Sequence, residues 1–236
     1  MAEVILVVSG DPGRREDLLA AARCLAALNG DGRVRMLALA PPAAAVDVPG
    51  EVLAAGADVA AEVETRGSRA DFIVVAQPGP ADDRATRAAF EAALFRTERP
   101  VLMLPPDVLP PGAAGAFGRR VAIAWRDDAQ AIKALVPALR LLAGAEQIHL
   151  LAGVRPGTPA PAIPPVLVEH GLAATLHVLA IGGVPFGEML LDRARELGAD
   201  LLIMGAYTHS PLREKLLGGT TRSVLAHADL PVLLRH

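Results

Sequence analysis

The chain has 236 residues, of which 52% are hydrophobic and 3% aromatic, and 23 basic against 26 acidic residues give it a formal charge of −3. This composition is typical of a globular protein with small-residue helix faces packed on an aliphatic sheet, and it argues against a disordered chain. The arginines are scattered and form no basic stripe, so we do not expect nucleic acid as a partner. The N-terminal stretch MAEVILVVSGDPGRRE has an apolar run too short for a signal or a membrane span, which predicts a cytoplasmic protein with no membrane partner.

The first half of the chain predicts alternating strands and helices. The strands are expected at 3–8, 33–39, 71–76 and 100–104, and the helices at 14–28, 51–66 and 83–97. The proline-rich segment 41–49 stands where the second half has an additional helix and strand, so we expect the first half to lack both.

A Pro/Gly-rich segment, 105–115, follows the first half and predicts a domain boundary near residue 112, between domains at 1–111 and 112–236. The second half alternates without a gap. Its strands are expected at 120–125, 147–152, 174–180, 200–205 and 231–235, and its helices at 128–143, 163–171, 185–197 and 219–228. Such alternation predicts right-handed crossovers and a parallel sheet with helices on both faces.

An internal repeat relates the two halves. VILVVSGD (4–11) aligns with VAIAWRDD (121–128) at an offset of 117, ADFIVVA (70–76) with ADLLIMG (199–205) at 129, and RPVLML (99–104) with LPVLLR (230–235) at 131. Because the order of the segments is the same, we predict two copies of one fold, which we expect to pair within the chain, with the first copy trimmed.

One loop of the second half is the candidate binding segment. It runs from Gly205, at the end of a predicted buried strand, through GAYTHSPLREKLLGGTTR to the start of the last helix. Ligands of open parallel sheets bind at the carboxyl ends of strands, and free N–H groups at a helix N-terminus favour anions. The spacing matches neither GxxxxGK[ST] nor GxGxxG, so a phosphate loop and an ordinary turn both stay open.

Residues 205–234 resemble the closing segment of the universal stress protein family, and the whole chain is similar to its tandem two-domain members. The resemblance implies an α/β fold of two tandem open parallel-sheet domains, Rossmann-like and of the adenine nucleotide alpha hydrolase-like kind. It also implies a stress-response or regulatory module.

Nucleotide-binding members of that family carry a glycine, two residues, a second glycine, nine residues, and then a glycine followed by serine or threonine. Here Thr208 replaces the second glycine and Gly219 replaces the hydroxyl residue, although Thr220 offers a hydroxyl one position later. Those relatives also place an aspartate directly after the first strand, where this chain has Arg126 and then Asp127.

The resemblance implies one adenine nucleotide site, for ATP or ADP with Mg²⁺, in the second half. Its predicted residues are Gly205, Thr208, His209, Gly218, Gly219, Thr220 and Asp127. The corresponding first-half loop, QPGPADD at 77–83, is too short and proline-rich to hold a phosphate, so we expect at most one site per chain. The lone Trp125 is expected in the core, with stacking on a base as the alternative.

No Ser-His-Asp order with a nucleophile elbow, no carboxylate pair and no metal-ligand spacing stands out in the sequence, so we expect no enzyme beyond slow ATP hydrolysis and no metal site in the protein itself. A second hypothesis is that the glycines are remnants and that the protein acts through contacts with unidentified protein partners. The edge strands at 101–104 and 232–234 predict a homo-oligomer under either hypothesis.

Overall fold

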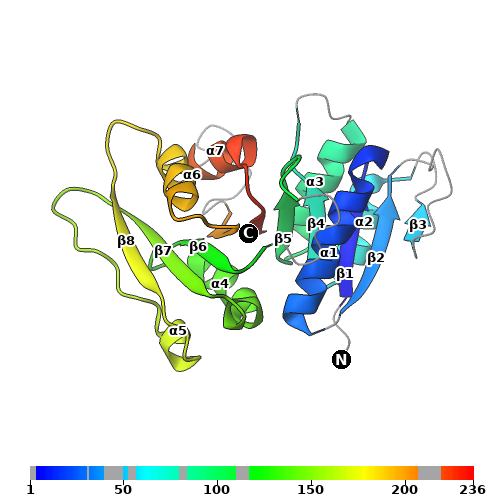
Figure 1. Ribbon diagram of the computed structural model, residues 1–236. Coiled ribbons are helices and arrows are strands. Elements are labelled where there is room, and N and C mark those ends of the chain that lie inside the picture. The colour runs from blue at the N-terminus through cyan, green and yellow to red at the C-terminus, as the bar shows by residue number, and fades with distance from the viewer. Residues whose placement is uncertain are drawn as a thin grey trace. The chain divides into compact units, whose positions relative to one another are not determined.

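The computed structural model describes residues 4–30, 32–39, 50–52, 57–79, 84–109, 117–206 and 219–236. The chain forms two compact units, Met1–Ala116 and Phe117–His236. The boundary predicted near residue 112 lies outside the described residues. Each unit is an α/β fold built on a parallel sheet (Figure 1), as the alternating pattern predicts.

The first unit contains a five-stranded parallel sheet of order β3-β2-β1-β4-β5. Its strands are β1 (Val4–Ser9), β2 (Arg33–Ala38), β3 (Gly50–Val52), β4 (Phe72–Ala76) and β5 (Val101–Leu104). Its helices are the 3-10 turn η1 (Pro12–Arg14), α1 (Arg15–Asn29), α2 (Val59–Gly67) and α3 (Arg84–Arg96). The central strands are buried on both sides because helices cover the two faces of a sheet of this type.

The first unit differs from the prediction in one segment. In place of a helix over 51–66, the chain forms β3, which pairs with β2, and then α2, capped by the Asp58 carboxylate through the Ala61 N–H at 3.2 Å. The strand that the first half was expected to lack is therefore present, and the described part of this unit lacks only a helix corresponding to α5. A three-residue strand is too short for its periodicity to be seen beside an alanine-rich helix.

The second unit contains a five-stranded parallel sheet of order β10-β9-β6-β7-β8. Its strands are β6 (Arg120–Ala124), β7 (Gln147–Val154), β8 (Thr175–Ala180), β9 (Leu201–Gly205) and β10 (Val232–Arg235). Its helices are α4 (Ala129–Ala143), α5 (Pro165–Glu169), α6 (Phe186–Glu196) and α7 (Gly219–His227). Each of these elements occurs where the sequence predicts it, with ends shifted by a few residues at most.

Sheet register refines the alignment of the two units. Ile5 pairs with Phe72 in the first unit, and Val121 pairs with Leu201 in the second. Since Phe72 and Leu201 follow the same Ala-Asp pair, Ile5 corresponds to Val121 at an offset of 116 rather than 117. The second unit thus has one more residue between its first strand and the cap of the following helix, because the caps are Asp11 and Asp128. None of the described helices is both long and apolar enough to cross a membrane.

Candidate functional site

A cavity of about 280 Å³ opens in the second unit at the carboxyl ends of its central strands. Ala124 ends β6, Met204 and Gly205 end β9, and Gly153 belongs to the neighbouring β7; all four line it. Open parallel sheets place their ligands at this edge. The volume lies near the lower end of the roughly 300–1,000 Å³ that is usual for small-molecule sites.

One wall of this cavity is apolar. It includes Trp125, which follows β6, Ile181, which follows β8, and Phe186, which begins α6. The Trp125 side chain is buried, and its indole N–H donates to the Ala162 carbonyl at 2.9 Å. Trp125 is therefore fixed as a core residue, as expected, and its surface forms part of a rigid apolar wall.

Polar residues at the beginnings of two helices also line the cavity. The Asp128 carboxylate caps α4 by accepting the Ala131 N–H at 2.9 Å, and it also pairs with the Arg126 guanidinium. Thr220 and Thr221, in the first turn of α7, face the same cavity. The positive ends of helix dipoles favour negatively charged groups. Among the described residues, no group of three or more His, Cys, Asp or Glu could hold a metal ion.

Two glycines that line this cavity are required because neighbouring atoms leave no room for a side chain. A Cβ atom on Gly153 would lie 2.6 Å from the Phe186 ring, and one on Gly205 would lie 2.9 Å from the Gln130 carbonyl oxygen of α4. Both distances are shorter than non-bonded carbon and oxygen atoms tolerate. Gly205 therefore lets β9 end directly against the first turn of α4, whatever the cavity binds.

The structure brings together part of the predicted site. Gly205 and Thr220 line the cavity, and Gly219 begins α7 as an exposed residue with open space around its α-carbon. Asp127 is exposed and does not line the cavity, whereas its neighbours Arg126 and Asp128 do. The remaining predicted residues, Thr208, His209 and Gly218, lie outside the described residues.

Sequence reasoning missed the residues that complete the cavity walls. Gly153 lies in β7, Ile181 follows β8, and Phe186 is the first residue of α6. No motif marks them, because they meet only through the parallel pairing of β7 and β8. The single available signal was topological, since segments that follow the carboxyl ends of adjacent parallel strands meet at one edge.

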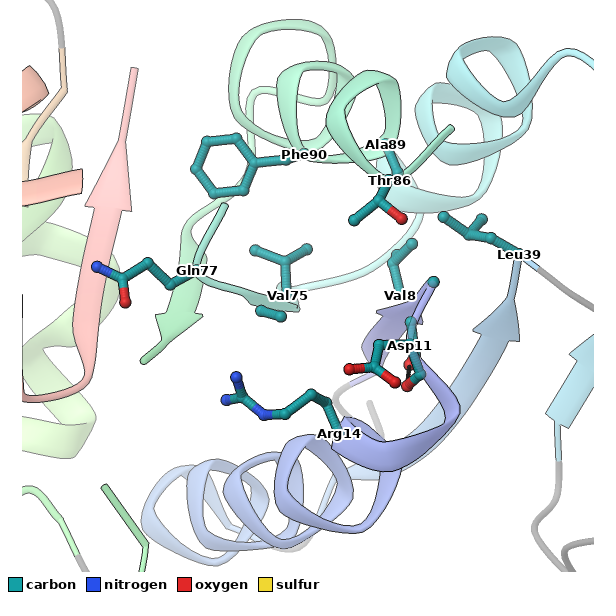
Figure 2. A pocket seen from close by; sticks show the side chains of 12 residues that line it. Val8, Asp11, Arg14, Leu39, Val75, Gln77, Thr86, Ala89 and Phe90 are labelled. Atoms are coloured by element: carbon teal, nitrogen blue, oxygen red, sulfur yellow. Dashed lines mark hydrogen bonds between the residues drawn. The ribbon is translucent and has the colours of Figure 1, made fainter. Parts of the chain in front are cut away.

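The first unit also has a cavity at the carboxyl ends of its central strands (Figure 2). Its volume is about 70 Å³, a quarter of that in the second unit. It lies at the carboxyl ends of β1 and β4 and is lined by Val8, Ser9, Gly10, Asp11, Arg14, Leu39, Val75, Ala76, Gln77, Thr86, Ala89 and Phe90.

Two side chains of the first unit border this crevice closely. The Arg14 guanidinium donates from Nη2 to the carbonyls of Leu104 at 3.2 Å and Pro105 at 2.8 Å, at the end of β5. On the other side, the Thr86 hydroxyl would lie 2.1 Å from a Cβ atom on Gly10, so α3 approaches the end of β1 closely. Arg14 and Thr86 therefore border a cavity that has about a quarter of the volume of the one in the second unit.

Comparison with known proteins places the chain among relatives of one family. The model of the universal stress protein family matches residues 69–236. None of the curated protein sequences compared with the chain matches it.

Solved structures show the same fold over nearly the whole chain. A universal stress protein from Archaeoglobus fulgidus superposes with a TM-score of 0.69 at 16% identity, covering 98% of this chain and 95% of that one. A putative universal stress protein from Pseudomonas aeruginosa gives 0.68 at 14% identity, with 99% and 93% covered. The cytoplasmic domain of a prokaryotic cation chloride cotransporter gives 0.52 at 13% identity, with 99% and 95% covered.

Proposed function

The chain belongs to the universal stress protein family, and on that premise we propose that its second unit binds an adenine nucleotide in the cavity between the ends of β6 and β9. The observation that carries this proposal is the meeting of Gly205, Thr220 and an apolar wall around one cavity. The first unit carries no second site in this proposal, because the corresponding cavity has a volume of only about 70 Å³.

The chemistry of the cavity walls suits the two ends of a nucleotide. Ile181, Phe186 and the buried Trp125 offer an apolar surface for a base. Thr220 and the first N–H groups of α7 offer donors for phosphate oxygens, and the N-terminus of a helix adds a favourable field. Mg²⁺ would enter with the phosphates, since these oxygens are the ligands it prefers.

The wider function that we propose follows from this site. The protein is a cytoplasmic stress-response or regulatory module that associates with copies of itself, and its nucleotide is a bound signal that is hydrolysed slowly at most. We assign no catalytic residue among the described residues that line the cavity.

A second candidate function remains open because of Gly219. This residue stands where nucleotide-binding relatives carry a hydroxyl, and it begins α7 with open space around it. If Thr220 does not replace that hydroxyl, the protein acts through protein contacts alone, as a module that works by association.

Thermal unfolding with and without millimolar ATP and Mg²⁺, together with chromatography of nucleotide released from the denatured protein, distinguishes the two functions. We expect an unfolding midpoint that rises with nucleotide concentration, as mass action requires when a ligand binds only the native state. An unchanged midpoint and an empty extract would contradict nucleotide binding and favour the second function.

Two matched pairs of variants locate the ligand. Ala124→Leu adds bulk inside the cavity and should abolish the rise, whereas Ala143→Leu, at the exposed end of α4, should retain it. Thr220→Val replaces the hydroxyl with a methyl group of similar size and should weaken binding about tenfold or more, as for a lost hydrogen bond to a charged group. Thr158→Val is its exposed control. If Ala124→Leu still responds to nucleotide, the ligand lies elsewhere.

A further inference from the structure

Two histidines of the second unit form a hydrogen-bonded pair away from the cavity. His149 of β7 and His177 of β8 lie on adjacent paired strands, with Nδ1 of His149 at 3.1 Å from Nε2 of His177. Their ring centroids are 5.2 Å apart. Both side chains are half-buried.

The pair continues on each side into a chain of polar groups. The Arg193 Nη2 of α6 lies 3.2 Å from Nδ1 of His177, and the Gln147 Oε1 of β7 lies 3.4 Å from Nε2 of His149. Arg193 also holds Glu196 through Nη1 at 2.7 Å. This series of hydrogen bonds therefore connects α6 to β8 through His177, and through His177 and His149 to β7.

Arg193 and Gln147, the groups at the two ends of this hydrogen-bonded series, fix the tautomers of both histidines. A guanidinium can only donate, so Nδ1 of His177 must accept and its Nε2 must carry the proton. That proton is donated to Nδ1 of His149, whose own proton then sits on Nε2 and points at the Gln147 oxygen. Every donor meets an acceptor only when both imidazoles are neutral.

A single added proton breaks the pattern wherever it goes. On His177 it places an N–H against the Arg193 donors. On His149 it places an N–H against Nε2 of His177, which can accept only by moving its own proton to the side of Arg193. Either way two donors face each other, and a second positive charge lies beside the guanidinium.

We infer that His149, His177 and Arg193 form an acid-sensitive latch, which holds α6 on β7 and β8 when both imidazoles are neutral and releases it when one is protonated. The inference does not depend on the proposed nucleotide site. It identifies a response to pH that the fold carries in its own side chains.

The electrostatic surroundings support this assignment. Burial and the Arg193 charge lower the pKa of His149, and burial, Arg193 and His149 together lower the pKa of His177. The charged groups that face the pair come from α6, as Arg193 with its partner Glu196; β7 and β8 carry no charged residue besides the histidines. Next to Gln147, Glu146 is paired with Arg119, while Asp192 and Arg195 of α6 are paired with each other.

Release of α6 would reach the cavity through two contacts. Phe186, the first residue of α6, lines it, and Gly187 packs so closely on α7 that a Cβ atom there would lie 2.9 Å from the Thr220 carbonyl oxygen. This consequence rests on the proposed function, whereas the latch itself does not.

The latch is tested first on the unmodified protein by NMR. Long-range ¹H–¹⁵N spectra at neutral pH should show both histidines as Nε2–H tautomers, and both should titrate below the ordinary value of about 6.5. An Nδ1–H tautomer at His177, or a titration at the ordinary value for both residues, would overturn the inference.

Variants then test the consequence for stability. Because the folded pKa values lie below the unfolded ones, the native state binds fewer protons, so stability should be complete above about pH 7 and fall as the pH decreases toward about 5. His177→Gln should show a smaller fall in the urea midpoint than the unmodified protein, and the exposed His170→Gln should retain the whole fall. Arg193→Gln should raise both histidine pKa values, and Arg195→Gln should not. Equal pH dependence in His177→Gln and His170→Gln would contradict the latch.

Discussion

Gly205 ends β9 directly against Gln130 of α4: a Cβ atom on Gly205 would lie 2.9 Å from the Gln130 carbonyl oxygen and 3.0 Å from its carbonyl carbon. The atoms that would be hit belong to the backbone of a helix, so they cannot move aside as a flexible side chain could. The first glycine of the loop is therefore required by packing as well as by any ligand, and its presence alone is no evidence for nucleotide binding.

Gly205→Ala should destabilise the protein by about 1–3 kcal/mol, because the added methyl group forces apart β9 and α4. Gly182→Ala is the matched control, since a Cβ atom there meets no atom within 4 Å. Its effect should stay within about 0.5 kcal/mol. Urea unfolding measures both, and equal midpoints for the two variants would contradict the close approach.

Asp128, rather than Asp127, should matter for the helix that borders the cavity. Asp128→Ala removes the cap of α4 and should cost about 1 kcal/mol, within the usual 0.5–2 for a lost cap. Asp127→Ala changes an exposed side chain that does not line the cavity, so stability and nucleotide response should both remain. A nucleotide response lost only in Asp127→Ala would restore the predicted role of that residue.

Arg14 should stabilise the first unit. Arg14→Met removes both donors from the Leu104 and Pro105 carbonyls, and the side chain is only 19% exposed. We expect a loss of about 1.5–3 kcal/mol, typical of hydrogen bonds to a charged group. Arg96→Met is the control: its pair with Glu64, at 3.7 Å, is exposed on both sides and should contribute about 0–1 kcal/mol. Similar losses in the two variants would argue against a structural role for Arg14.

Nucleotide binding should weaken on acidification if the latch holds the cavity together. Between about pH 7 and about pH 5, the nucleotide-induced rise in midpoint should shrink in the unmodified protein and shrink less in His177→Gln. Nucleotide titration by calorimetry at both pH values measures this directly. Equal loss of affinity in both proteins would separate the cavity from the latch, while leaving the NMR test of the latch unaffected.

Much of the fold could be predicted because buried strands and amphipathic helices leave a local pattern. Each element of the second unit was predicted, since its strands are aliphatic runs and its two longest helices, α4 and α6, are long enough to show periodicity. The exception in the first unit, β3, has only three residues and owes its existence to pairing with β2. A local pattern cannot show such a strand.

Only part of the candidate site could be predicted, and for a related reason. Gly205 and Thr220 belong to one contiguous segment with family character, so the sequence identifies them. Phe186, Gly153 and Ile181 lie on segments whose only relation is the parallel pairing of β7 with β8, which brings their ends to one edge. Asp127 is the first aspartate after Arg126, which is why the resemblance points to it, whereas Asp128, one residue later, caps α4 and lines the cavity.

The sequence by itself determined the repeated α/β architecture, its family and the strand ends where a ligand would bind, because these follow from hydrophobic periodicity and one local motif. Only the tertiary structure decided that Arg14 bonds to the end of β5 beside a small first cavity, that Gly205 serves packing, and that His149 and His177 meet. Each of these depends on side chains from strands or helices that are distant in sequence, and the distances between such atoms are set by strand register and helix packing rather than by any local pattern.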